Sequence, residues 1–303
     1  MQVALIGYGE VGRILAEDLR ARGTAVAAFD IELAAGSPTA QAMRRHALQC
    51  KVTLAGSSAE AVRGASLVVS AVTANQALAV AQSCAPGLTR GTFFLDFNSA
   101  SPGTKIRAAD SVNAAGGRYV EGAVMTALPA HRIKVPLLLG GPDAAALLPL
   151  LNDLGFAAKV SSQRLGVASA TKMCRSVMIK GLEAMVIEAF TTARHHGVED
   201  AVIASLNETF PAIDWNKQGA YFFQRVIEHG RRRSEELREV ALTVREAGLE
   251  PWSAAGTAER QAWMADLADA GLFGPEGGAG FARSADWRIE ADRILAQLKK
   301  KES

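Results

Sequence analysis

Short apolar runs alternate with helix-like segments over the first half of the chain. The runs at residues 2–6 and 66–72 are each followed by a segment, 10–23 and 75–85, in which apolar residues recur every three to four positions. Apolar runs of this kind predict strands buried on both faces, and repeated strand–helix units predict a parallel sheet. The same pattern predicts further strands at residues 25–30, 51–54, 92–98, 118–124, 135–141 and 156–161.

After residue 163 the pattern changes, because long helical repeats follow one another without a convincing strand. These repeats predict helices at 165–196, 199–210, 216–247, 257–270 and 284–303. We therefore predict two domains. The first, at residues 1–163, is an α/β N-terminal Rossmann domain, doubly wound around a mostly parallel sheet, and the second, at residues 164–303, is an all-α C-terminal domain.

The composition is that of an ordinary globular protein. Apolar residues make up 49% and charged residues 21% of the 303 positions, so the chain can bury a sizeable core. The net charge of +2 gives no reason to expect binding to nucleic acid or to an anionic membrane. No apolar run is long enough to span a bilayer, and the first residues lack the pattern of a signal peptide.

Cysteine and histidine spacing excludes two kinds of site. Cys50, Cys84 and Cys174 are odd in number, lie far apart and form no C-x-x-C pair, which argues against a disulfide framework or a structural zinc site. His195 and His196 also lack the spacing of metal ligands, so we expect no bound metal. A reducing cytoplasm is the expected location.

A glycine-rich loop joins the first strand to the first helix. Residues 7–12 read GYGEVG, which matches G-x-G-x-x-G. In a dinucleotide-binding loop Gly7 would allow the tight turn, Gly9 would let a pyrophosphate approach the backbone, and Gly12 would let the helix pack closely. The free amides at the helix N-terminus would face the phosphates. A chance glycine cluster is disfavoured, since the whole strand–helix–strand unit is present.

Asp30 ends the second strand, near the spacing expected for an acid that binds the adenosine ribose. Its carboxylate would accept hydrogen bonds from the ribose hydroxyls and repel a 2′-phosphate, which favours NAD over NADP. Arg44 and Arg45 keep NADP open, and a plain strand-end turn residue is the alternative for Asp30. The residues predicted to bind the cofactor are Gly7, Tyr8, Gly9, Glu10, Val11, Gly12, Asp30, Val72 and Thr73.

Four stretches give the chain a family resemblance. They are LIGYGEVGRILAEDLRARG (5–23), LDFNSASP (95–102), VEGAVMTA (120–127) followed by LLLGGPDAAALLPLLNDLG, and GVASATKMCRS (166–176). In this order they resemble the motifs of the β-hydroxyacid dehydrogenases and the related 6-phosphogluconate dehydrogenases. The resemblance covers nearly the whole chain and implies the same two-domain fold and a homodimer.

The resemblance also implies that Lys172 is a general acid–base. Oxidation of an alcohol needs such a group, because the hydroxyl proton must leave when the hydride leaves. A lysine accepts that proton only if its pKa falls from about 10.4 toward the working pH, through burial or nearby cations. The substrate-binding residues that the resemblance implies are Asn98, Ser99, Thr126, Arg175, Ser176 and Arg233.

The chain departs from the family motifs where the substrate is bound. Met125 and Thr126 stand in place of a serine and a glycine, and Arg175 and Ser176 stand in place of two asparagines. Arg233 lies in a basic helix segment that could reach the substrate from a partner subunit. We therefore expect a small carboxylate-bearing substrate that differs from the usual 3-hydroxyacids.

The leading hypothesis is an NAD-dependent dehydrogenase that oxidises an alcohol on a hydroxyacid-type substrate. One alternative is an imine or ketone reductase on the same scaffold, which would prefer NADPH. Another is a protein that senses NAD(H) without turnover, since the altered substrate positions are compatible with lost chemistry. The sequence does not identify the substrate, and it does not show whether the oxidised product is decarboxylated.

Overall fold

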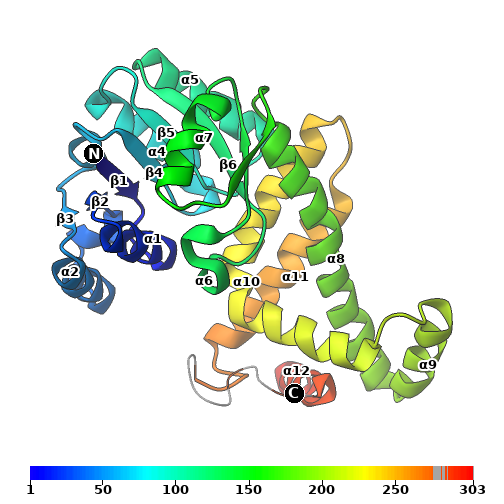
Figure 1. Cartoon of the computed structure of the whole chain (residues 1–303). Helices are drawn as coiled ribbons and strands as arrows, with labels where there is room; N and C mark the ends of the chain where they lie inside the picture. The colour runs from blue at the N-terminus through cyan, green and yellow to red at the C-terminus, as the bar shows by residue number, and fades with distance from the viewer. Residues whose placement is uncertain (276–280, 282–283, 285, 303) are drawn as a thin grey trace. The chain divides into compact units, whose positions relative to one another are not determined.

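The computed structural model describes residues 1–275, 281, 284 and 286–302 (Figure 1). Its contacts divide the chain into two compact units, Met1–Cys174 and Arg175–Ser303. The division lies inside helix α8 (Val167–His196). The domain boundary predicted after residue 163 instead falls between the last strand and this helix. Lys172 therefore belongs to the first unit by its contacts.

The first unit is built on one eight-stranded sheet with the order β3-β2-β1-β4-β5-β6-β7-β8. Every neighbouring pair is parallel except β6 and β7, which are antiparallel. The strand order reverses between β1 and β4, where an open α/β sheet forms its ligand crevice. The bounds are β1 (Gln2–Ile6), β2 (Ala25–Phe29), β3 (Thr53–Leu54), β4 (Leu67–Ser70), β5 (Phe93–Asp96), β6 (Arg118–Val124), β7 (Leu137–Gly140) and β8 (Ala158–Ser162).

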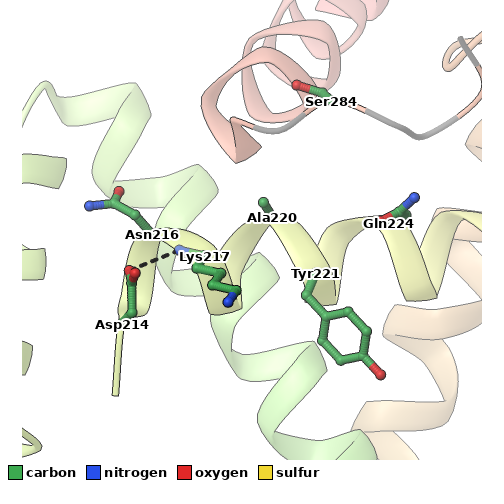
Figure 2. A pocket seen from close by; sticks show the side chains of 7 residues that line it. All are labelled: Asp214, Asn216, Lys217, Ala220, Tyr221, Gln224 and Ser284. Carbon is green, nitrogen blue, oxygen red and sulfur yellow. Dashed lines mark hydrogen bonds between the residues drawn. The ribbon is translucent and has the colours of Figure 1, made fainter. Parts of the chain in front are cut away.

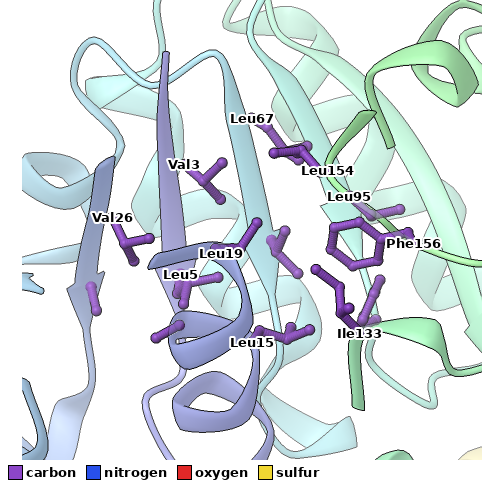
Figure 3. Packing of buried hydrophobic residues seen from close by; sticks show 14 of the residues in the cluster. Val3, Leu5, Leu15, Leu19, Val26, Leu67, Leu95, Ile133, Leu154 and Phe156 are labelled. Carbon is purple, nitrogen blue, oxygen red and sulfur yellow. The ribbon is translucent and has the colours of Figure 1, made fainter. Parts of the chain in front are cut away.

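Side chains of β1 alternate between two cores, which confirms the predicted doubly wound sheet. Val3 and Leu5 pack with residues of α1 such as Leu15 and Leu19 (Figure 3). Ala4 and Ile6 belong to the other core, with residues of α3, α4 and α5. Each large apolar side chain buried in this way contributes about 1.5–3 kcal/mol. The strand is apolar throughout because both of its faces are covered.

Seven helices accompany the sheet in this unit: α1 (Glu10–Ala21), α2 (Pro38–Cys50), α3 (Ser58–Val62), α4 (Ala77–Cys84), α5 (Pro102–Ala114), α6 (Leu128–His131) and α7 (Ala144–Asp153). Several begin with the residue types that cap helices. Ser37 caps α2, Ser57 caps α3 and Ser101 caps α5, each by accepting a backbone amide three residues on. Pro38 and Pro102 follow their caps at the first helical position, where proline is tolerated.

The second unit contains the rest of α8 together with α9 (Glu199–Thr209), α10 (Trp215–Glu246), α11 (Trp252–Asp269) and α12 (Trp287–Glu302). Its core is rich in aromatic residues, among them Phe190, Phe223 and Trp287. Helix α11 begins before the predicted residue 257, and the sequence missed this turn because only Ala254 in it is buried. Among the described residues, no helix combines the length and hydrophobicity that a bilayer span requires.

Candidate functional site

In the first unit, the chain leaves the sheet toward the predicted site residues just after one row of paired strand residues. Ile6 pairs with Ser70, Ser70 with Asp96, and Asp96 with Glu121 across β1, β4, β5 and β6. On the other side of β1, Ile6 pairs with Phe29. Since β1, β2, β4, β5 and β6 run parallel, the residues that follow this row meet at the same edge of the sheet. That edge is where open α/β sheets bind ligands.

The glycine-rich loop is tight toward the protein and open on the other side. A Cβ on Gly7 (φ +96°) would lie 2.3 Å from the Ala71 carbonyl oxygen, and one on Gly12 would lie 2.1 Å from the Gly7 carbonyl oxygen. A Cβ on Gly9 would meet nothing within 4 Å. Gly9 is also the N-cap of α1, whose first amides have no partner within the helix. This geometry fits a dinucleotide whose pyrophosphate approaches the backbone at Gly9.

Asp30 is tied to the glycine-rich loop. One carboxylate oxygen accepts the Tyr8 amide at 2.7 Å, and the other accepts the Glu32 amide at 3.0 Å. Each oxygen of a carboxylate has a second lone pair, so Asp30 retains acceptors for ribose hydroxyls. The Arg44 guanidinium donates to the Leu33 carbonyl oxygen at 2.6 Å. It is therefore engaged with backbone in this structure.

The Tyr8 side chain turns into the core. It is fully buried, its hydroxyl is hydrogen bonded to His46 Nδ1 at 2.9 Å, and His46 Nε2 is 2.9 Å from Glu17. Burial raises the pKa of Tyr8 well above its ordinary value. Because its backbone amide also donates to Asp30, Tyr8 anchors the loop to the core. Glu10 is exposed and Val11 is half-buried in the first turn of α1.

Asn98 links the ends of β4 and β5. Its side-chain oxygen accepts the Val72 amide at 2.7 Å, and its side-chain nitrogen donates to Ser70 Oγ at 2.9 Å. Asn98 is buried, so it holds Val72 in place rather than projecting into solvent. Thr73 follows in the same loop, is exposed, and donates to Asn75 through its hydroxyl at 2.7 Å.

A buried ion pair that sequence reasoning missed lies beneath the loop after β5. Lys105 Nζ is 3.0 Å from one carboxylate oxygen of Asp96, and the Tyr119 hydroxyl donates to the other at 2.7 Å. The amide of Asn98 also donates to Asp96, at 2.8 Å. Burial, the largest cause, and the Asp96 charge raise the pKa of Tyr119. These contacts fix the end of β5, from which the loop to Ser99 departs.

Lys172 and Ser99 meet in the first unit. The Lys172 ammonium donates to Ser99 Oγ at 2.6 Å, and both side chains are partly accessible. The predicted acid–base and one predicted substrate residue thus share a hydrogen bond, although their roles remain predictions. Ser101, two residues beyond Ser99, caps α5 and so directs the loop toward its helix.

Glu121 is the second functional feature that sequence reasoning missed. It is fully buried in β6 and accepts from the backbone amide of Ala168 at 3.0 Å and from the Ser169 hydroxyl at 2.8 Å. These donors belong to the first turn of α8. The available signal was a charged residue inside the apolar strand RYVEGAV, because glutamate is almost never fully buried without a partner.

Of the remaining predicted substrate residues, Thr126 belongs to the first unit and Arg175 and Ser176 to the second. Thr126 is exposed just after β6. Arg175 and Ser176 begin the second unit on α8, where Arg175 is exposed and Ser176 is buried. The roles of all three in substrate binding stay predictions.

Arg233 lies in the interior of the helical unit. Its guanidinium is paired with Glu183 and donates to Gln261 at 3.3 Å, and burial lowers the pKa of Arg233. Near it, Lys180 pairs with Glu236 at 2.5 Å. Arg233 is only 4% exposed, so its guanidinium is committed to this network in the structure. Its predicted contact with substrate would require it to leave Glu183.

The helical unit also carries an open hollow that contains none of the predicted residues. Asp214 caps α10 there by accepting the Lys217 amide at 3.1 Å (dashed line in Figure 2). The residues lining the hollow are Asp214, Asn216, Lys217, Ala220, Tyr221, Gln224 and Ser284. Among the described residues, no group of three or more histidine, cysteine, aspartate or glutamate side chains is placed to hold a metal ion.

Residues 2–158 match the family model described as the NAD binding domain of 6-phosphogluconate dehydrogenase. The chain belongs to this family. The predicted resemblance is thereby confirmed, and the glycine-rich loop lies in an NAD(P)-binding domain. Residues 193–264 match a second model, described as a domain of unknown function (DUF1932).

Solved structures extend the likeness over both units of this family member. A conserved hypothetical protein from Sinorhizobium meliloti 1021 is 34% identical, with a TM-score of 0.75 over 98% of this chain and 96% of that chain. The conserved protein MTH1747, described as structurally similar to 3-hydroxyacid dehydrogenases, is 28% identical, with a TM-score of 0.68 over 89% and 98%. The 3-hydroxyisobutyrate dehydrogenase of Mycobacterium tuberculosis, solved with L-serine, is 16% identical and shares the fold, with a TM-score of 0.70 over 97% and 98%. The chain therefore has a hydroxyacid dehydrogenase-like, NAD(P)-binding scaffold.

Proposed function

We propose that this protein is an NAD-dependent dehydrogenase that oxidises a hydroxyl group on a small carboxylate-bearing molecule, with Lys172 as the general acid–base. The observation that carries the proposal is the hydrogen bond from Lys172 Nζ to Ser99 Oγ at 2.6 Å. It brings the family's acid–base position and its substrate loop together in the unit that holds the glycine-rich loop. Membership of the family supports redox chemistry with a nicotinamide cofactor.

The chemistry needs a hydride acceptor and a proton acceptor. Bound NAD would take the hydride from the carbinol carbon. Lys172 in its neutral form would take the hydroxyl proton, and in the reverse reaction its ammonium would return that proton to the forming alkoxide. Ser99 holds Lys172 Nζ from one side, which restricts the directions in which the amine faces a substrate. Such orientation is a large part of what an enzyme contributes to a bimolecular reaction.

Asp30 supports NAD as the preferred cofactor. Its carboxylate stands beside the glycine-rich loop, fixed by the Tyr8 amide at 2.7 Å. A second negative charge on the adenosine ribose would be repelled there, while ribose hydroxyls would be accepted.

A carboxylate substrate is supported by the residues that depart from the family motifs. Arg175 offers a planar guanidinium that can bind a carboxylate through two parallel hydrogen bonds, which an asparagine cannot do. Ser176 and Thr126 add hydroxyl groups to the predicted substrate set. A homodimer, with Arg233 supplied by a partner subunit, and a cytoplasmic location are further parts of the proposal.

The experiment is a screen of small hydroxy acids, not limited to the usual 3-hydroxy acids, with NAD⁺ and with NADP⁺, following the absorbance of the reduced nicotinamide. We expect turnover of at least one hydroxy acid, faster with NAD⁺ than with NADP⁺. Activity only toward ketones or imines with NADPH would instead identify a reductase. Tight NADH binding without turnover in either direction would identify a sensor, and either result would overturn the proposal.

A further inference from the structure

We propose that Glu121 is a positioning residue that anchors the first turn of α8 to the sheet and thereby places Lys172 against Ser99. The inference rests on the proposed role of Lys172. Glu121 would act through the helix, because its hydrogen bonds go to Ala168 and Ser169. It is absent from the set of residues that the family resemblance assigned to the site.

The contacts of Glu121 converge on the helix N-terminus. One carboxylate oxygen accepts the Ala168 amide at 3.0 Å, and the other accepts the Ser169 hydroxyl at 2.8 Å and the Ser169 amide at 3.4 Å. Amides of the first turn lack partners within a helix. A negative charge beside them also interacts favourably with the helix dipole. Glu121, a strand residue, therefore caps α8. The residue that precedes the helix, Gly166, has no side chain that could do so.

The helix carries this anchorage directly to Lys172. Ala168 and Lys172 are four residues apart on α8, so they lie one above the other on the same helix face. A shift of the first turn therefore shifts Lys172 with it. A displacement of about 1 Å at a catalytic group can cost about 100-fold in rate.

The sheet leaves space for the Glu121 side chain and fixes its backbone. Glu121 pairs with Gly140 across β6 and β7, and a Cβ on Gly140 would lie 2.2 Å from Glu121 Oε1. Gly140 thus leaves room for the carboxylate. On its other side Glu121 pairs with Asp96, which fixes the end of β5 before Ser99. The buried carboxylates of Asp96 and Glu121, on adjacent strands, consequently fix the backbone segments that carry Ser99 and Lys172.

The experiment combines Glu121→Gln with Lys172→Ala. Glutamine keeps the shape of the side chain but replaces one acceptor oxygen by an NH₂ donor that faces backbone amides. With the most active hydroxy acid of the screen, we expect kcat to fall about 10- to 100-fold for Glu121→Gln, with the Kd of NADH changed less than twofold. Amide hydrogen exchange at Ala168 and Ser169 should become faster.

Rescue of Lys172→Ala by added ethylamine separates positioning from a merely structural effect. If Glu121 acts by placing Lys172, adding Glu121→Gln leaves the amine-rescued rate unchanged, because there is no lysine to misplace. An equal loss in the rescued background would overturn the positioning role. The control variant Glu290→Gln removes another buried carboxylate, from α12, and should change neither kcat nor the exchange at Ala168.

Two further results complete the test. Ser169→Ala removes one donor to Glu121 without disturbing the strand, so it should lower kcat in the same direction by a smaller factor, even if Glu121→Gln fails to fold. Full turnover by Lys172→Ala would contradict the proposed function. Loss of turnover by Lys172→Ala, with none by either Glu121→Gln or Ser169→Ala, would contradict only the positioning role.

Discussion

The Lys172 ammonium donates a hydrogen bond to the Ser99 hydroxyl at 2.6 Å, although the two residues are 73 positions apart in the sequence. Ser99 leaves the end of β5 and Lys172 stands in the first turns of α8. Their meeting unites the end of a sheet strand with the helix that leads out of the nucleotide-binding unit. A substitution of either residue therefore tests the role of this hydrogen bond in turnover.

Replacing Ser99 by alanine removes the acceptor of this hydrogen bond. A hydrogen bond to a charged group contributes about 1.5–3 kcal/mol, so kcat/KM for the best hydroxy acid should fall about 10- to 100-fold. NADH binding, measured by fluorescence titration, should be unchanged. Ser111→Ala on α5 is the matched control, because among the described residues its hydroxyl bonds only the Arg107 carbonyl oxygen. An unchanged kcat/KM in Ser99→Ala would show that the hydrogen bond plays no part in turnover.

The glycine-rich loop offers a pair of variants with opposite consequences. Gly12→Ala would place a Cβ 2.1 Å from the Gly7 carbonyl oxygen, so it should lower the free energy of unfolding by about 1–3 kcal/mol. Gly9→Ala meets nothing within 4 Å, so it should leave the Tm nearly unchanged yet weaken NADH binding by tenfold or more, an estimate of about 1.4 kcal/mol or above. Thermal unfolding and NADH titration of both variants measure these effects. Full NADH affinity in Gly9→Ala would mean that the cofactor does not approach the loop there.

Asp30 should control the choice of cofactor. Asp30→Ser removes the negative charge but keeps an oxygen near the Tyr8 amide, so the ratio of kcat/KM for NADP⁺ to that for NAD⁺ should rise by about tenfold or more. Asp110→Ser, which removes an exposed carboxylate from α5, serves as the control and should leave the ratio unchanged. If the unaltered protein already prefers NADP⁺, the function assigned to Asp30 is incorrect.

Tyr119 tests the buried ion pair beneath the substrate loop. Tyr119→Phe leaves one oxygen of the buried Asp96 carboxylate without its donor at 2.7 Å. The free energy of unfolding should fall by about 1.5–3 kcal/mol, because the lost hydrogen bond is to a charged group. Urea unfolding provides the measurement, with Tyr221→Phe on an exposed site of α10 as the control. Equal stability of Tyr119→Phe and the unaltered protein would show that Asp96 is satisfied without Tyr119.

The sequence was sufficient for the fold because apolar periodicity is a local property. Strand β1 reads as continuous apolar residues, and the structure divides Val3 and Leu5 from Ala4 and Ile6 between two cores. The glycine-rich loop was also predictable, since its motif, its strand and its helix are consecutive. Lys172 was placed by resemblance to a family motif, and its structural partner Ser99 belonged to a second motif.

The anchoring residues escaped prediction because their partners are distant in the chain. Glu121 accepts the amide of Ala168, 47 positions after it, and Asn98 holds the amide of Val72 from 26 positions away. Asn98 resembled a substrate ligand, whereas its side chain is buried between two strand ends. Arg233 was expected to contact the substrate, whereas in the structure it pairs with Glu183 inside the helical unit. Such pairings depend on tertiary contacts that no local pattern contains.

The most direct test of Lys172 as the general acid–base is the steady-state rate of NAD⁺ reduction by Lys172→Met, measured beside its affinity for NADH. Methionine keeps most of the side-chain volume but cannot exchange a proton. We expect turnover of the best hydroxy acid to fall at least about 100-fold, while the Kd of NADH stays within twofold of the unaltered protein. Undiminished turnover by Lys172→Met would contradict the proposed role of Lys172 as the general acid–base.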